Sequence, residues 1–200
     1  MNDQKTANIL KVFREVGIVR PADLTKYGLR RELIYRLHKQ GLVERTGRGL
    51  YILRKAIITE NHSVAEACKK VPRGVICLLS ALRLHGLTTQ NPFEVWMAID
   101  RKARLPKSDS PKLRFVRYSG DALTAGVEVR RIEQVPVQVY GVAKTVVDCF
   151  KYRNKIGIDV ALEALRESRR ERACTMDELW RYAKICRVAN VMRPYLESVA

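Results

Sequence analysis

Three helical segments stand directly before a short hairpin in the first 58 residues, and this order restricts the fold more than any other feature of the sequence. Apolar residues recur at helical spacing in the first and third segments, which predicts helices over 6–16 and 30–40. Pro21 suits a first helical turn and starts a second, shorter helix that ends at Gly28. A chain of this order forms a small helical unit with a β extension.

The hairpin follows the third helix. Two short runs rich in branched and aromatic residues, 42–45 and 50–53, are joined by Thr46-Gly47-Arg48-Gly49. Glycines between such runs are typical of a tight β turn. Helix, helix, helix, hairpin is the order of a winged helix-turn-helix, so we expect residues 1–58 to form a DNA-binding domain of this type.

A recognition helix needs one apolar face for its own domain and an opposite face for DNA. The third helix has both, because Leu33, Ile34 and Leu37 turn inward while Arg31 turns outward. An arginine can donate two hydrogen bonds to guanine, which makes Arg31 the first choice for base reading. The expected DNA-binding residues of the helix and wing are Arg30, Arg31, Tyr35, His38, Lys39, Arg45 and Arg48. A solvated basic face, with Arg48 in water at the turn, is the alternative.

Charge supports a polyanionic partner. The chain has 38 Lys and Arg against 21 Asp and Glu, a net charge of +17. Residues 1–58 hold 13 basic and 5 acidic residues, a surplus of +8, whereas residues 59–200 hold 25 and 16, a surplus of +9 over more than twice the length. Nucleic acid is the commonest polyanion in a cell, although a merely soluble basic protein would show the same total.

Residues 59–200 are expected to form a C-terminal α+β domain, so that the whole chain is mainly α with small β elements. A helix opened by a capping box at Ser63–Glu66 and another over 74–85 come first. The expected strands are 94–99, 113–118, 127–132 and 135–140, and the expected later helices are 143–152, 158–172, 175–188 and 189 to the end. Helices, a small sheet and more helices favour the α+β class.

The C-terminal region has a cationic loop. Its basic residues are Arg101, Lys102, Arg104 and Lys107, which we treat as a possible second contact with DNA or with an acidic partner. A solvated loop would have the same composition. His85, just before Gly86, is expected to be a capping or core residue rather than a base.

The sequence does not favour an enzyme. A restriction-type nuclease would place an Asp and a Glu-x-Lys among the strands, and Asp100, Asp109, Asp121 and Glu128 occur there. The third element reads Glu128-Val129-Arg130, however, without the lysine, and no phosphate-binding glycine motif occurs. We expect no catalytic residue and no cofactor, and keep a nuclease targeted by the winged domain as the alternative.

Cysteines and hydropathy bear on metal, disulfides and location. The five cysteines form no C-x-x-C pair, so neither a metal site nor a disulfide framework is expected. We expect them to be buried thiols in a reducing cytoplasm. The N-terminus lacks an apolar signal core, and the best apolar run, 75–82, is far short of a membrane span. The expectation is a cytoplasmic protein.

The order of these pieces resembles the AbiEi family of antitoxins from type IV toxin–antitoxin systems, over nearly the whole chain. The likeness is carried by the wing and by several C-terminal segments: Glu44–Tyr51, Ile76–Leu82, Leu84–Thr88, Val95–Ile99, Arg114-Phe115 and Thr145–Phe150. Arg30, Arg31, Tyr35 and Arg48 match the recognition helix and wing of that family.

The resemblance implies two activities for a bacterial, phage-defence protein of the abortive-infection type. The winged domain would repress its own operon by binding inverted repeats in the promoter. The C-terminal domain would counter a nucleotidyltransferase-like toxin without forming a stable complex with it. No short motif of the C-terminal domain carries the antitoxin activity, so no antitoxin residues are assigned.

Overall fold

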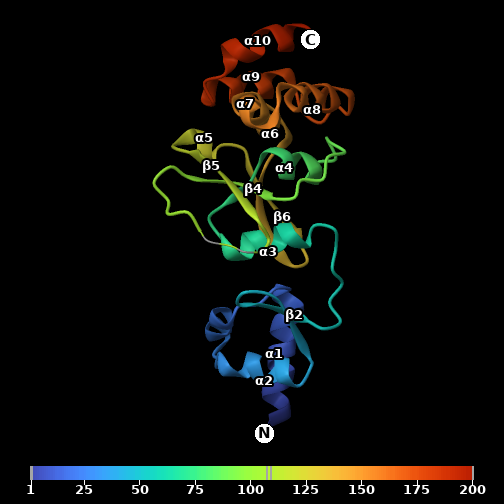
Figure 1. Cartoon of the computed structure of the whole chain (residues 1–200), viewed down its shortest axis with the longest axis vertical. Helices are drawn as coiled ribbons and strands as arrows, with labels where there is room; N and C mark the ends of the chain where they lie inside the picture. The colour runs from blue at the N-terminus through green and yellow to red at the C-terminus, as the bar shows by residue number, and fades with distance from the viewer. Residues whose placement is uncertain (1, 107, 109, 200) are drawn as a thin grey trace. The chain divides into compact units, whose positions relative to one another are not determined.

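The computed structural model describes residues 2–106, 108 and 110–199, so that Lys107 and Asp109 lie outside the described residues (Figure 1). The chain divides into two compact units. The first comprises residues 2–72 together with 108, 110–111 and 131–137, and the second comprises 73–106, 112–130 and 138–199. The split of function expected at residue 58 stays a prediction.

The first unit contains the elements expected of a winged helix-turn-helix. They are α1 (Asn2–Val16), η1 (Pro21–Tyr27), α2 (Glu32–Lys39), β1 (Val43–Gly47) and β2 (Leu50–Leu53). The second element is a 3-10 helix, and α2 begins two residues later than the sequence indicated, with Arg31 as its N-cap. The predicted helix–helix–helix–hairpin order is therefore confirmed.

A small apolar core holds these elements together. Its fully buried members come from every element: Ile9, Val12, Phe13, Val19, Leu24, Ile34, Leu37, Val43 and Tyr51. Tyr51 also pairs with Val19 through two backbone hydrogen bonds of 2.9 and 3.0 Å. This bridge ties the hairpin to the segment between α1 and η1, and so fixes the wing relative to the helices.

The first unit also includes α3 (His62–Lys70). The capping box predicted at Ser63–Glu66 is wrong, because the helix already begins at His62 with Asn61 as N-cap. The carboxylate of Glu66 instead faces His62, with 3.6 Å between Oε1 and Nε2. An ion pair one turn apart within the helix has taken the side chain that the capping-box pattern assigned to the helix end.

The second unit is built on a five-stranded mixed sheet in the order β5-β4-β3-β7-β6, although residues 131–137 of the β6–β7 hairpin group with the first unit. The strands are β3 (Val75–Ile76), β4 (Val95–Asp100), β5 (Leu113–Tyr118), β6 (Val127–Ile132) and β7 (Val135–Tyr140). β4 runs parallel to β5 and antiparallel to β3, and β3 runs parallel to β7. Four of these strands were expected from the sequence.

The helix predicted over 74–85 is partly wrong. Val75 and Ile76 form the two-residue strand β3 at the centre of the sheet, and α4 starts only at Leu78. Ile76 lies opposite Met97 on β4 and Val139 on β7, so both of its neighbours come from distant parts of the sequence. These pairings override the local helical pattern.

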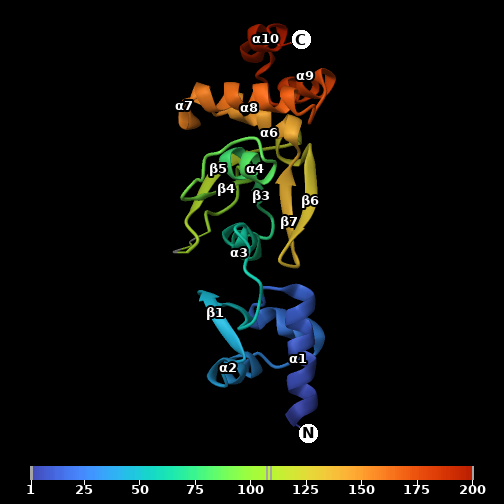
Figure 2. The same ribbon diagram turned by 90° about the vertical axis from the view of Figure 1, so that its right-hand side faces the viewer.

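Seven helices complete the second unit: α4 (Leu78–Leu84), α5 (Asp121–Thr124), α6 (Val142–Lys151), α7 (Arg153–Ile156), α8 (Ile158–Arg170), α9 (Met176–Ile185) and α10 (Ala189–Glu197). Figure 2 shows α6 to α10 gathered at one end of the sheet. The capping box at Thr175 is confirmed, since Glu178 N donates to its hydroxyl at 3.2 Å. With its sheets and helices the chain has the expected α+β class.

Candidate nucleic-acid interface

The second and third helical elements of the first unit form the helix-turn-helix. Gly28, with φ 68°, ends η1 in the left-handed conformation that glycine adopts without steric cost. α2 then buries Ile34 and Leu37 completely against the core. The residues expected to contact DNA are all exposed on the helix and the hairpin: Arg30, Arg31, Tyr35, His38, Lys39, Arg45 and Arg48.

The N-terminal end of α2 carries two adjacent arginines. Arg30 and Arg31 form the turn that leads into the helix, and their carbonyls accept from Leu33 N and Ile34 N at 3.2 Å. Neither guanidinium takes part in an ion pair with a described residue. The positive end of a helix dipole also favours anions, so this turn is suited to a phosphate or a base edge.

Tyr35 and His38 have contacts within the domain. His38 Nδ1 lies 3.1 Å from the carbonyl oxygen of Val43, and its ring packs edge-on against Tyr51 with 5.8 Å between centroids. Tyr35 packs against the same ring at 6.2 Å. Because Tyr51 belongs to β2, these contacts hold the exposed face of α2 to the base of the wing.

The wing places Arg48 at the tip of the hairpin. Residues 48 and 49 form the turn, and Gly49 has φ 72°. Arg45 Nε donates to the carbonyl of Gly47 at 3.2 Å, at a point where the strand pairing shifts register. Arg45 therefore braces the turn, whereas no hydrogen bond or ion pair is recorded between the Arg48 side chain and another described residue.

Arg36 is a cation that the sequence analysis did not single out. It lies on α2 beside the buried face, and its Nε and Nη2 atoms are buried without a hydrogen-bond partner among the described residues. A buried, unpaired guanidinium is energetically costly. In the sequence, Arg36 is visible only as a basic residue next to apolar positions. From helical spacing alone, such a residue is assigned to the edge of the apolar face.

Residues 9–54 match the family model of AbiEi antitoxin transcriptional regulators. The match runs from α1 through the end of β2, and covers under a quarter of the chain. The resemblance drawn from the sequence is confirmed for this AbiEi-type region, and it supports a regulatory, antitoxin-type role. No curated protein matches the chain.

The fold beyond the AbiEi-type region has a structural relative. The crystal structure of the RV2827C protein from Mycobacterium tuberculosis superposes with a TM-score of 0.56 at 14% sequence identity, and the match covers 84% of this chain. This chain spans 66% of the length of that one. At such low identity the likeness shows the fold alone.

The cationic loop of the second unit is ordered by Arg117 and Asp100. Arg117 Nη1 donates to the carbonyls of Arg101 and Ala103, and the Asp100 carboxylate accepts from Lys102 N at 2.7 Å. Arg101, Lys102 and Arg104 are exposed, and Lys107 lies outside the described residues. The loop thus presents three cations on a defined backbone.

The carboxylates of the nuclease alternative are spread over the sheet. Asp100 ends β4 and Glu128 lies on β6, with β3 and β7 between these strands. Asp121 begins α5, and Asp109 lies outside the described residues. Among residues 2–106, 108 and 110–199, no group of three His, Cys, Asp or Glu side chains is placed to hold a metal ion. The sheet order gives Asp100 and Glu128 no shared site.

The remaining chemically notable side chains are structural. All five cysteines are buried and none of them forms a disulfide, and burial raises the pKa of the Cys77 and Cys149 thiols. His85 caps α4, and its Nε2 lies 2.7 Å from the Tyr140 carbonyl. Burial lowers the pKa of His85, which fits the expected structural role.

In the part of the chain described, no helix is both long and apolar enough to cross a bilayer.

Proposed function

We propose that the chain is a sequence-specific transcriptional autoregulator with antitoxin activity, of the type IV toxin–antitoxin class. One observation carries this proposal. A winged helix-turn-helix that matches the AbiEi model exposes the cations of its recognition helix and wing, with Ile34 and Leu37 anchored behind them. Double-stranded DNA is the ligand that such a surface recognises.

The residues divide into two roles on DNA. Arg31 would read a guanine in the major groove, and Arg30 would meet a phosphate at the start of the helix. Arg48 at the wing tip would enter a minor groove or contact the backbone, with Arg45 bracing the turn. Tyr35, His38 and Lys39 would complete the contact surface on α2. Inverted repeats in the promoter would then engage two copies of the domain.

The second unit would supply the antitoxin activity. It would counter a nucleotidyltransferase-like toxin without forming a stable complex, in the bacterial cytoplasm. The loop cations Arg101, Lys102 and Arg104 are exposed and available for a second contact with DNA or an acidic partner. The expected role is regulation rather than catalysis.

The test has two arms. The full chain should shift its own promoter DNA and bind a shuffled duplex of the same length at least tenfold more weakly at physiological salt, a modest margin for a specific DNA-binding protein. If a nucleotidyltransferase-like toxin gene lies next to the gene of this protein, co-expression of the chain with that toxin should restore growth. Equal affinity for both duplexes would contradict sequence-specific binding to the promoter. Metal-dependent DNA cleavage by the chain that Asp100→Ala abolishes would favour the nuclease alternative instead.

A further inference from the structure

A cationic pocket in the second unit is lined by none of the residues expected to contact DNA on α2 and the wing. It has a volume of about 580 Å³ and is formed where β4 and β5 end and α5, α6 and α9 begin or end. Asp100 and Tyr118, the last residues of the two parallel strands, lie opposite each other. The crevice beyond the carboxyl ends of parallel strands is where open sheets commonly bind ligands.

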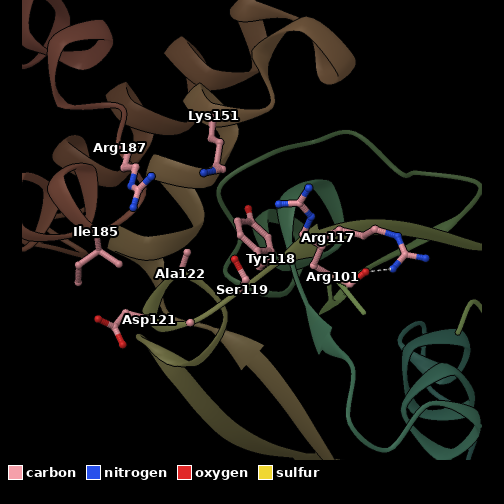
Figure 3. Close-up of a pocket in the computed structure, with 10 residues that line it drawn as sticks. Arg101, Arg117, Tyr118, Ser119, Asp121, Ala122, Lys151, Ile185 and Arg187 are labelled. Carbon is pink, nitrogen blue, oxygen red and sulfur yellow. Dashed lines mark hydrogen bonds between the residues drawn. The ribbon is translucent and has the colours of Figure 1, made fainter. Parts of the chain in front are cut away.

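Four cations and one carboxylate line this pocket. Arg101 and Arg117 lie on the sheet side, and Lys151 and Arg187 lie on the helical side (Figure 3). Asp121 is at the edge of the pocket remote from Arg101 and Arg117 (Figure 3). Within the described part of the chain, none of the four cations forms an ion pair. Like charges held together repel each other, and an anion in the pocket would relieve that repulsion.

The cations keep free donors even though the fold holds two of them in place. Lys151 Nζ donates one hydrogen to the Cys186 carbonyl at 2.9 Å, which leaves two of its three donors. Arg117 uses Nη1 for loop carbonyls, and no hydrogen bond joins its Nε or Nη2 to another residue that the structure describes. Their positions are therefore fixed before a ligand arrives, which reduces the entropy lost on binding.

The size and the remaining wall indicate the class of ligand. A volume of about 580 Å³ lies within the range of small-molecule sites, roughly 300–1,000 Å³, and is larger than one inorganic phosphate fills. Apolar surface from Tyr118, Ala122 and Ile185 borders the cations. A ligand with two or more phosphates and an uncharged remainder satisfies both parts of the wall.

We propose that this pocket binds a phosphate-rich small molecule of the nucleoside di- or triphosphate class, through Arg101, Arg117, Lys151 and Arg187. The proposal does not rest on the operator contact, and of the loop cations considered for a second contact with DNA only Arg101 lines this pocket. It would make the second unit responsive to a soluble anionic ligand.

Two variants with matched controls test the site on the full chain. Arg187, which lines the pocket, has φ 58°, and Arg172, which does not, has φ 49°; both residues are exposed. Arg187→Asn therefore removes a charge from the pocket, and its control Arg172→Asn removes a charge elsewhere from the same left-handed backbone conformation. Arg101→Gln and Arg104→Gln form a second matched pair in one loop, because only Arg101 lines the pocket. Thermal unfolding of each variant verifies that the fold is kept.

Calorimetric titration with ATP, GTP, pyrophosphate, orthophosphate and adenosine gives the readout. ATP, GTP and pyrophosphate should bind, adenosine should not, and orthophosphate should bind at least about tenfold more weakly than pyrophosphate, since charge-assisted contacts are lost. Arg187→Asn and Arg101→Gln should each reduce ATP affinity about tenfold, and their controls should not.

Several outcomes would overturn the proposal. The proposal fails if ATP, GTP and pyrophosphate do not bind at millimolar concentration. It also fails if Arg172→Asn reduces ATP affinity as much as Arg187→Asn does, because that result would mean diffuse attraction to a protein of charge +17. If the pocket variants weaken binding of duplex DNA while none of the small molecules binds, the four cations belong to a nucleic-acid surface instead.

Discussion

The ammonium nitrogen of Lys144 lies 2.7 and 2.6 Å from the two carboxylate oxygens of Asp148, and both side chains are completely buried. The rings of Tyr140 and Tyr118 lie 3.9 and 4.6 Å from the same nitrogen. Burial raises the pKa of Asp148, against the opposing effect of Lys144. A charge pair one turn apart on α6 thus stands at the centre of the second unit.

Removing one partner of this pair should be strongly destabilising. Asp148→Ala or Lys144→Ala leaves an unpaired buried charge, and we expect a loss of about 3–5 kcal/mol in the free energy of unfolding. The double change to Lys144→Met and Asp148→Leu should cost less than either single one. Urea denaturation gives these values, and Glu167→Ala, which breaks a partly exposed pair with Arg170, should change stability by less than about 1 kcal/mol. A loss of similar size in the two single variants and in the double variant would show that packing rather than charge decides.

The specificity of DNA binding should depend on Arg31. Replacing it with alanine removes a bidentate contact, so we expect a loss of about 1–3 kcal/mol on the operator and relaxed preference at one base pair. Competition binding with single-base operator variants measures both, with the exposed Arg193→Ala on α10 as control. Equal loss on operator and random DNA would make Arg31 a phosphate contact.

The wing should contribute through charge. If Arg48 neutralises a phosphate, Arg48→Ala should weaken binding on all sequences and lower the slope of log affinity against log salt by roughly one. Titrations at several salt concentrations give the slope. A slope equal to that of the unchanged protein would remove Arg48 from the interface.

The stability of the first unit should fall with rising pH because of His62. The carboxylates of Glu66 and Glu133 raise the pKa of His62 to about 9, although partial burial acts in the opposite direction. A folded pKa above the unfolded value of 6.5 gives stability that is complete below pH 6.5 and is lost as pH rises through 9. The contribution is on the order of 3 kcal/mol. Thermal unfolding of His62→Gln should lack this decline, and an unchanged pH profile would exclude His62 as its source.

Gly17 should not tolerate a side chain. A Cβ there would lie 1.8 Å from the Glu133 carbonyl oxygen, and the backbone has φ 71°. Gly28 has φ 68° with open space around it, so Gly28→Ala isolates the backbone cost of about 1–2 kcal/mol. Gly17→Ala should lower the unfolding temperature further than Gly28→Ala does. Equal decreases in unfolding temperature for the two variants would mean that the backbone at Glu133 moves away from the new Cβ without an energetic cost.

Local signals were enough for much of the fold. The elements of the winged domain were predictable because proline and glycine mark their ends. In addition, the apolar residues on the buried face of each helix recur at a regular spacing in the sequence. β5, β6 and β7 were placed at their observed bounds for the same reason. The exposure of Arg31 and Arg48 also followed from helix geometry and turn chemistry, since neither needed a distant partner.

Other features depended on residues far apart in the sequence, which no local pattern contains. Val75 and Ile76 became a strand only because β4 and β7 lie beside them, and His62 at the start of α3 pairs with Glu133, which lies 71 residues further along the chain. The spacing of Lys144 and Asp148 is visible in the sequence, but their complete burial is decided by the packing of α6. The cationic pocket collects side chains from four separate segments. The sequence by itself therefore determined the elements and the winged domain, and only tertiary structure decided which charges became buried and which came together, because burial and convergence are properties of packing between distant segments.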